Sequence, residues 1–75
     1  MDPLTEILTE LLPYANLESE KSLVDDHILE SMDIMTLIPD LEDAYDIRIP
    51  RKEICAANLN NVEAMRAMIE RLKEE

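Results

Sequence analysis

The chain has 75 residues, a formal net charge of −11 at pH 7, no glycine and only two aromatic residues. Its length allows one domain, residues 1–75, with a single small core, and the lack of glycine argues against an all-β fold, whose tight hairpins need residues with positive φ. The acidic charge disfavours nucleic acid as a partner and favours a monomer that binds basic surfaces of other proteins.

A single cysteine, Cys55, excludes an internal disulfide and is typical of a reducing compartment. It stands among Ile54, Ala56 and Ala57, so we expect it to be a small buried apolar residue. No apolar run approaches the length of a membrane span. We therefore expect a cytoplasmic protein without membrane insertion.

The first predicted element is a helix that begins at Pro3 and ends near Leu12. Asp2 can cap it, and Pro3 suits the first helical position because the missing N–H has no partner to lose there. Five apolar residues then follow the spacing of one buried helix face: Leu4, Ile7, Leu8, Leu11 and Leu12. Pro13 disfavours helical backbone at the preceding residue, so the helix should stop there.

Residues 14–30 form a long predicted connection between the first and second helices. Apolar residues are scattered among charges in this segment: Leu17, Leu23, Val24, Ile28 and Leu29. A loop of this length is either functional or carries irregular structure of its own. We expect these apolar side chains to pin the loop to the core.

The second helix is predicted from Ser31 to about Tyr45, with apolar residues at Met32, Met35, Leu37, Ile38 and Leu41. Pro39 lies inside this segment and removes one backbone donor. Two outcomes compete, a kinked continuous helix or two shorter helices. The amphipathic pattern continues to Tyr45, which favours the continuous helix.

The C-terminal third predicts an extended connector up to Pro50, a short helix from Arg51 to Ala56, and a final helix. Asn60 and Glu63 have the spacing of a capping box at the start of that helix. Its buried stripe should be Val62, Met65, Met68, Ile69 and Leu72. The expected fold is all-α, a small bundle of three main helices plus one short helix. The predicted core is Leu4, Ile7, Leu8, Leu11, Leu37, Leu41, Tyr45, Ile49, Val62, Met65 and Ile69.

Ser31 is the residue with the most ambiguous chemistry. A serine at a helix start is often only a cap, since its hydroxyl can accept a hydrogen bond from a free backbone N–H. A hydrolytic serine would need a base and an oxyanion hole. His27 is the only histidine, four residues upstream, and no glycine-rich turn could aim backbone donors. We expect no catalytic activity from this chain alone.

Acidic residues are the other candidate functional groups. Asp25, Asp26 and His27 could suggest a metal site, but adjacent loop residues do not converge on one point, so a solvated acidic loop is the better interpretation and no metal site is expected. A second group of acids surrounds Ser31 or follows it along the helix: Glu30, Asp33, Asp40, Glu42 and Asp43. An acidic helix that opens with an exposed serine has the features of a recognition surface around an attachment point.

The segment ESMDIMTLIPDLEDAYDIRIP, residues 30–50, resembles the signature of acyl carrier proteins and related phosphopantetheine-binding domains. Ser31 matches the serine of the family's Asp-Ser-Leu triplet, with Glu30 in place of the aspartate and Met32 in place of the leucine. Leu41 and Glu42 match a Leu-Glu pair, and Tyr45 an aromatic position. The exit motif matches Ile47, Ile49 and Pro50, and NVEAMRAMIERL fits the family's final helix.

The resemblance implies that Ser31 carries 4′-phosphopantetheine, which a phosphopantetheinyl transferase adds from coenzyme A. The thiol of that arm would hold acyl groups as thioesters, and loading ligases or synthases with basic docking patches would be the partners. The implied partner-binding residues are Glu30, Met32, Asp33, Met35, Asp40, Glu42 and Asp43.

Two alternatives stay open at the level of sequence. The run from His27 to Ser31 and the small size also resemble stand-alone D-alanyl or aminoacyl carrier proteins, loaded by an adenylating ligase. The chain could instead be an acidic helical interaction module without a prosthetic group.

Overall fold

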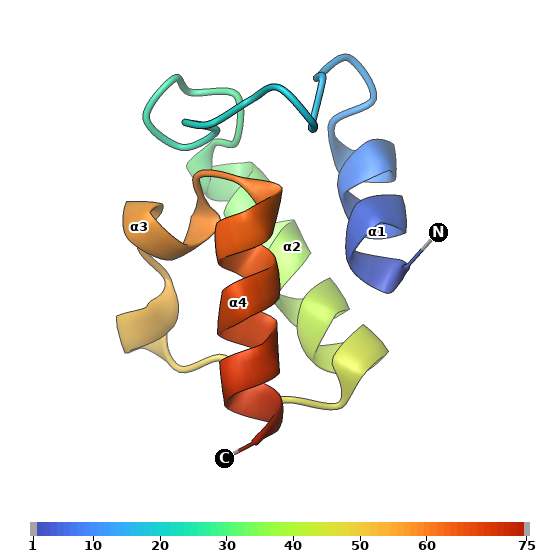
Figure 1. Cartoon of the computed structure of the whole chain (residues 1–75), viewed down its shortest axis with the longest axis vertical. Helices are drawn as coiled ribbons and strands as arrows, with labels where there is room; N and C mark the ends of the chain where they lie inside the picture. The colour runs from blue at the N-terminus through green and yellow to red at the C-terminus, as the bar shows by residue number, and fades with distance from the viewer. Residues whose placement is uncertain (1, 75) are drawn as a thin grey trace.

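The computed structural model describes residues 2–74, which form a small all-α bundle (Figure 1). Its helices are α1 (Pro3–Leu11), α2 (Ser31–Tyr45), α3 (Ala56–Leu59) and α4 (Val62–Lys73), with a 3-10 turn at Arg51–Glu53. No strand occurs within residues 2–74, which confirms the all-α prediction. In the same range, no helix has the length and apolar character needed to cross a membrane.

Helix α1 begins as its sequence predicts. The Asp2 carboxylate accepts a 2.9 Å hydrogen bond from the Thr5 backbone N–H, and Pro3 occupies the first helical position. Leu4 and Leu8 are fully buried. The helix ends at Leu11, one residue before the predicted end, although the Leu12 N–H still donates to the Leu8 carbonyl.

Helix α2 runs without interruption through Pro39, so the alternative of two shorter helices is wrong. Pro39 is on the exposed side. At the C-terminal end, Asp46 adopts the left-handed conformation with φ of 53°, and its N–H donates to the Glu42 carbonyl. In a chain without glycine, an aspartate therefore takes the conformation that commonly ends helices.

The prediction of a single short helix from Arg51 to Ala56 is wrong. The 3-10 turn stops at Glu53, and the backbone at Cys55 is extended before α3 begins at Ala56. The Asn58 side-chain amide donates to the Glu53 carbonyl at 2.8 Å and to its carboxylate at 3.0 Å, which links α3 to the 3-10 turn across this break. Cys55 is exposed and not buried, because it stands in this break.

Helix α4 begins one residue later than the predicted capping box requires. Asn61, not Asn60, is its cap, and accepts a 2.8 Å hydrogen bond from the Ala64 N–H. Asn60 instead contacts the long loop. The capping-box prediction is wrong because Asn60 makes contacts far away in sequence, and Asn61 caps the helix although Ala64, not a glutamate, stands three residues later.

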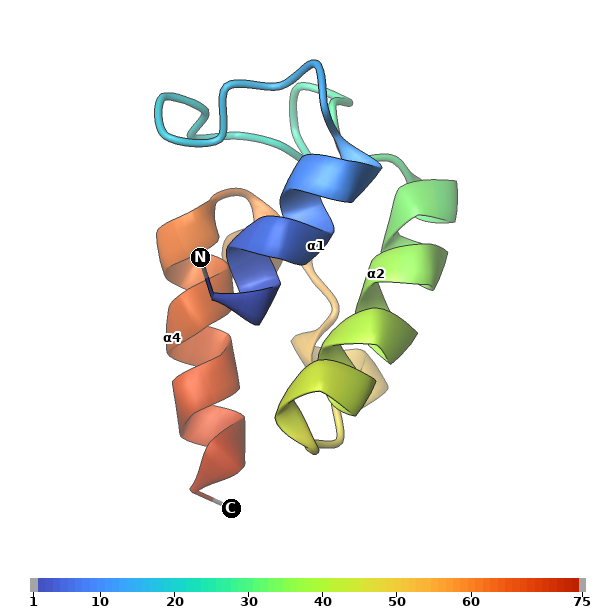
Figure 2. The same cartoon turned by 90° about the vertical axis from the view of Figure 1, so that its right-hand side faces the viewer.

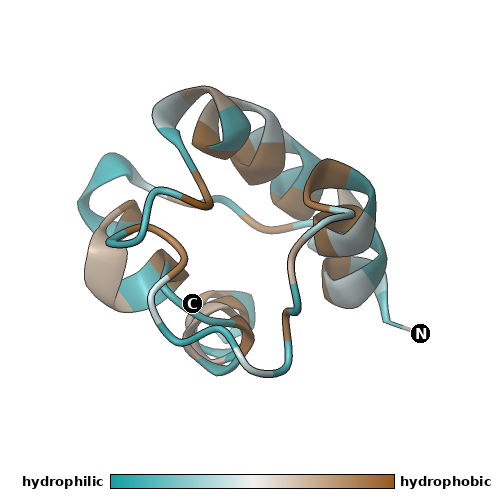
Figure 3. Ribbon diagram, turned by 90° about the horizontal axis from the view of Figure 1, so that it is seen from above, coloured by the Kyte–Doolittle hydropathy of each residue, from teal (hydrophilic) through white to brown (hydrophobic). Residues whose placement is uncertain are grey.

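The core lies between the helices and beneath the long loop (Figures 2 and 3). Helix α1 packs against α2, and α3 packs against α4. The buried apolar residues are Leu4, Leu8, Leu12, Leu23, Leu29, Leu37, Ile38, Leu41, Ile49, Leu59, Met65, Met68, Ile69 and Leu72. Four predicted core residues, Ile7, Leu11, Tyr45 and Val62, are only half-buried and pack around this core. Leu23 and Leu29 confirm that the loop is pinned by its apolar side chains.

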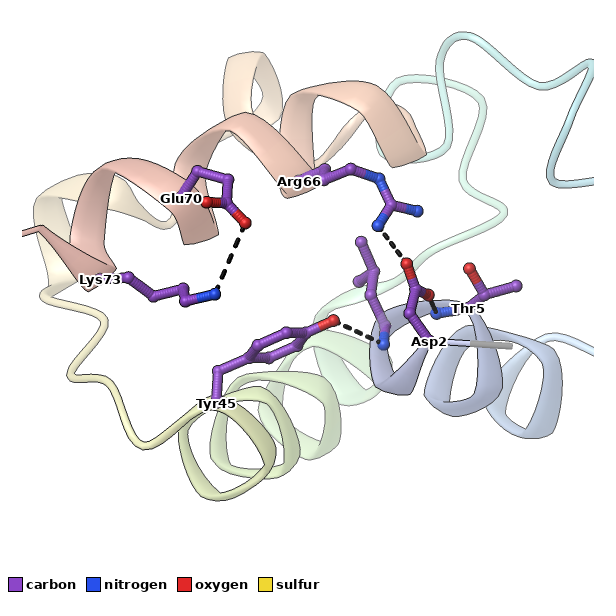
Figure 4. A network of polar contacts seen from close by, with 7 residues as sticks. Asp2, Thr5, Tyr45, Arg66, Glu70 and Lys73 are labelled. Atoms are coloured by element: carbon purple, nitrogen blue, oxygen red, sulfur yellow. Dashed lines mark hydrogen bonds and ion pairs between the residues drawn. The ribbon is translucent and has the colours of Figure 1, made fainter.

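A polar network joins the start of α1 to the ends of α2 and α4 (Figure 4). Asp2 pairs with Arg66, and the Tyr45 hydroxyl accepts a hydrogen bond from the Leu4 N–H at 3.0 Å. Lys73 lies 5.8 Å from the centre of the Tyr45 ring. Hydrogen bonding by Thr5 and pairing with Arg66 lower the pKa of Asp2.

Candidate functional site

Ser31 is the first residue of α2 and is exposed to solvent. The N-cap is Glu30, whose backbone is extended, with φ of −97° and ψ of 174°. Ser31 is therefore not the cap, so the simplest structural explanation for this serine is wrong. Within residues 2–74, no hydrogen bond engages its hydroxyl, which leaves the oxygen accessible for chemistry by another molecule.

The backbone around Ser31 is held by its neighbours. The Asp33 carboxylate accepts a 3.1 Å hydrogen bond from the Glu30 N–H, and the Ile34 N–H donates to the Glu30 carbonyl at 2.9 Å. The first N–H groups of a helix lack partners in the helix itself and give this end a positive partial charge. A phosphate ester on Ser31 would lie beside these groups, which favours an anion there.

The solvent side of α2 carries two large apolar side chains. Met32 is 81% exposed and Met35 is 75% exposed. Asp40 and Asp43, farther along the helix, are exposed as well. Exposed methionines cannot be attributed to core packing. Flexible methionine side chains are common on surfaces that bind several partners.

Two of the predicted partner-binding acids have contacts within the fold. Asp33 is half-buried and holds the Glu30 N–H, as described above. Glu42 is half-buried, and its carboxylate accepts a 2.8 Å hydrogen bond from the Ile49 N–H. That bond fixes the connector after α2. Glu30 is exposed and its side chain faces the Asp33 backbone in the capping box of α2, so the acids without such a contact are Asp40 and Asp43.

An apolar groove of about 410 Å³ runs along the edge of α2, lined by Ile34, Met35, Ile38, Pro39, Arg51 and Ile54. Ser31, Met35 and Ile38 are spaced four and three residues apart, so they lie on one side of the helix. With a rise of 1.5 Å per residue, the groove begins at Ile34, about 4.5 Å along the helix from Ser31. A molecule attached to Ser31 can therefore reach the groove.

Sequence reasoning missed Arg51 and Ile54 as groove residues, and Asn60 as a contact of the long loop. No local sequence pattern indicates that Arg51 and Ile54 line the groove together with α2. Their position follows from the path of the chain between Pro50 and Ala56. The apolar Ile54 directly after the charged residues Arg51, Lys52 and Glu53 was the one available hint. One apolar residue in such a segment is as typical of a surface turn as of a groove wall.

His27 lies in the turn that precedes α2. It is exposed and has φ of 61°, which closes the turn that precedes α2. No hydrogen bond within residues 2–74 joins it to Ser31. Over the same residues, no three His, Cys, Asp or Glu side chains are grouped closely enough to hold a metal ion together.

Comparisons with protein-family models, with curated proteins and with solved structures gave no significant match for this chain. The functional interpretation therefore depends on the residues and geometry described above.

Proposed function

We propose that this protein is an acyl carrier protein that bears 4′-phosphopantetheine on Ser31 and carries acyl groups between partner enzymes. One observation carries the proposal. An exposed serine without a hydrogen-bond partner stands at the first position of a helix whose solvent face displays Met32 and Met35. A serine with a purely structural role at this place would be expected to cap the helix, and here Glu30 has that position.

The site fits the prosthetic group on two counts. The Ser31 hydroxyl is accessible, and the first-turn N–H groups of α2 stabilise an anion beside it. When bound, the group would supply a thiol on a long flexible arm, which holds acyl groups as thioesters. The protein itself contributes the attachment point and the surface that partners recognise, and it is not a catalyst in this proposal.

Attachment requires a second protein. The Ser31 oxygen would form a bond to the phosphorus that carries the pantetheine arm of coenzyme A, and the bond from that phosphorus to the remaining nucleotide would break. Adenosine 3′,5′-bisphosphate leaves, and the serine proton passes to a base of the transferase. Within residues 2–74, no side chain makes a hydrogen bond to the Ser31 hydroxyl, so in this proposal the transferase supplies the base.

The groove beside α2 favours an acyl cargo over the D-alanyl or aminoacyl alternative. Five of its six lining residues are apolar, and the sixth is Arg51. An aliphatic chain would bury apolar surface there, at about 25 cal/mol per Å² removed from water. An alanyl group has only a methyl group to bury, and its ammonium would gain nothing beside a guanidinium.

The partners would dock on the exposed face of α2. Met32 and Met35 would supply apolar contact area, while Glu30, Asp40 and Asp43 would attract basic patches on a transferase, ligase or synthase. These methionines also support the rival function, an interaction module without a prosthetic group, because that module would need the same exposed face.

Incubation with a broad-specificity phosphopantetheinyl transferase and coenzyme A separates the two functions. The carrier gains the mass of one arm, measured by intact-protein mass spectrometry. The interaction module gains none while its far-ultraviolet circular dichroism shows the helical fold. An unmodified mass from folded protein would thus overturn the carrier proposal.

A further inference from the structure

Asn60, at the junction of α3 and α4, binds the long loop through both its side chain and its backbone. The side-chain oxygen accepts hydrogen bonds from the backbone N–H groups of Val24 at 2.9 Å and Asp25 at 3.1 Å. The side-chain amide donates to the Asp25 carboxylate at 3.0 Å, and the Asn60 carbonyl accepts from the Leu23 N–H at 2.7 Å. One residue thus makes four hydrogen bonds to a segment 35–37 positions earlier in the chain.

The next contacts lead from Leu23 to Ser31. The Leu23 carbonyl accepts hydrogen bonds from the N–H groups of Ile28 at 2.9 Å and Leu29 at 2.8 Å. The side chains of Leu23 and Leu29 are fully buried in the core. Leu29 is followed by Glu30, the cap of α2, and then by Ser31. The hydrogen bond to Asn60 therefore fixes the position of Leu23. Leu23 in turn fixes Ile28 and Leu29, which precede Glu30 and Ser31.

Besides the contacts of Asn60, the loop is held by short-range turn hydrogen bonds, such as that from the Asp26 N–H to the Ser22 carbonyl, and by the burial of Leu23 and Leu29. Residues 12–30 contain no helix or strand, and the turn around His27 includes a non-glycine residue in the left-handed conformation. Such backbone persists only where surrounding contacts enforce it. Fixing each residue costs about 1–2 kcal/mol of conformational entropy, so a few well-placed hydrogen bonds decide whether the loop stays ordered.

We propose that the Asn60–Asp25 pair positions the loop that presents Ser31, so that loading of the serine depends on this pair. The inference rests on the proposed carrier function and adds to it two residues that touch neither the serine nor its arm. Both act through Leu23 and Leu29, so they are positioning residues. Neither lies on the exposed face of α2.

Because the Asn60 amide donates to the Asp25 carboxylate, the two residue types can be swapped between positions 60 and 25. Asn60→Asp keeps an oxygen for the Val24 and Asp25 N–H groups but places a carboxylate against the Asp25 carboxylate. In the double variant Asn60→Asp/Asp25→Asn, the amide at position 25 can donate to the carboxylate at position 60. Asp25→Asn alone should be tolerated, because the new amide can turn its oxygen toward the Asn60 amide. The exchange thus restores the contact with donor and acceptor reversed.

Asn58→Asp is the matched control. The Asn58 amide also donates to a carboxylate, that of Glu53, at 3.0 Å, so this substitution creates a similar repulsion. It does so between the 3-10 turn and α3 and leaves the loop contacts of Asn60 intact. A general loss of stability should therefore appear in both variants, whereas a change in Ser31 presentation should appear only in Asn60→Asp.

The experiment measures transferase kinetics with each variant as the varied substrate, together with amide hydrogen exchange in the free protein. A loop that is ordered only part of the time lowers the competent fraction, which raises KM in proportion and leaves kcat unchanged. For Asn60→Asp we expect exchange at Ile28 and Leu29 to accelerate about tenfold, the effect of losing one or two hydrogen bonds on the opening equilibrium. KM should rise by the factor by which the ordered fraction falls, which is at most the factor seen in exchange. The double variant should recover both values, and Asn58→Asp should match the wild type in KM.

The outcomes separate this inference from the carrier function. If the wild type is loaded and Asn60→Asp has an unchanged KM, the positioning role is overturned while the carrier function stands. If the wild type is never loaded, the carrier function fails. Hydrogen exchange at Ile28 and Leu29 then tests whether the Asn60–Asp25 pair holds the loop. Faster exchange in Asn60→Asp, reversed in the double variant, then supports the loop-holding role. Unchanged exchange overturns it.

Discussion

The hydroxyl of Tyr45, in the last turn of α2, accepts a 3.0 Å hydrogen bond from the backbone N–H of Leu4, in the first turn of α1. The first N–H groups of a helix have no partner within the helix, so Tyr45 satisfies a donor that would otherwise be unpaired beside the core. The bond joins two helix ends that are 41 residues apart. It also holds the end of α2 opposite to the one that carries Ser31 (Figure 2).

Tyr45→Phe should lower the free energy of unfolding by about 1 kcal/mol, because the Leu4 N–H loses its acceptor. Urea denaturation followed by circular dichroism measures the change. Tyr14→Phe is the matched control, since Tyr14 is 74% exposed and should tolerate the substitution without effect. Equal stabilities for the two variants would show that the Tyr45 hydrogen bond contributes nothing in solution.

Asp46 offers a test of the end of α2. It has φ of 53° and lies at the negative end of the helix dipole. Asp46→Gly and Asp46→Ala remove the same charge, but only glycine takes the left-handed conformation without a steric cost. The glycine variant should therefore be the more stable of the two by about 1 kcal/mol. Equal midpoints in urea would mean that the helix does not end in this conformation.

The lowered pKa of Asp2 leads to a specific prediction of how folding stability depends on pH. Hydrogen bonding by Thr5 and pairing with Arg66 lower its pKa in the folded state. A carboxylate whose pKa is lowered by folding stabilises the protein above its unfolded pKa, about 3.9, and this contribution is lost as the pH falls toward the folded pKa. Asp2→Asn keeps an oxygen to cap α1 but removes the charge that pairs with Arg66.

The stability difference between the wild type and Asp2→Asn should be constant from about pH 7 to pH 5 and should shrink below about pH 4. Urea denaturation across this range measures it. A difference that persists undiminished at pH 3 would show that the charge of Asp2 is not the source of the effect. The prediction concerns the difference alone, since acid also relieves repulsion among the other carboxylates.

The exposed acids of α2 should act through the rate of encounter. Asp43→Lys should slow association with the transferase, and the effect should shrink as salt rises because ions screen exposed charges. Glu10→Lys is the control, as it makes the same change in net charge at an exposed position on α1. Stopped-flow measurements at low and high salt compare the two. Equal rates would indicate attraction by overall charge, without a defined docking face.

The helices with a clear apolar spacing were predictable from sequence. The starts of α1 and α2 follow from local features, an Asp-Pro pair and the apolar pattern that opens at Ser31, and local features act within one turn. Leu37 and Leu41 are buried as that pattern requires. The same argument identifies Ser31 as the start of a helix, but it cannot say that Glu30 has the capping position.

The segment between Pro50 and Asn61 was not predictable in the same way. Its turns depend on Asn58 bonding to Glu53 and on Asn60 bonding to the loop. The choice between Asn60 and Asn61 as the cap of α4 depends on residues 23–25, which a local pattern does not include. Burial of Leu23 and Leu29 could be expected, whereas the hydrogen bonds that place them could not.

The most direct test of the carrier function is to map the attachment site. After incubation with the transferase and coenzyme A, the protein is digested, and fragment masses assign the modified residue. Ser19→Ala and Ser31→Ala are compared with the wild type, because Ser19 is an exposed serine of the loop that precedes α2. The account predicts an arm on Ser31 in the wild type and in Ser19→Ala, and none in Ser31→Ala. An arm on Ser31→Ala, or its absence from folded wild type, would contradict it.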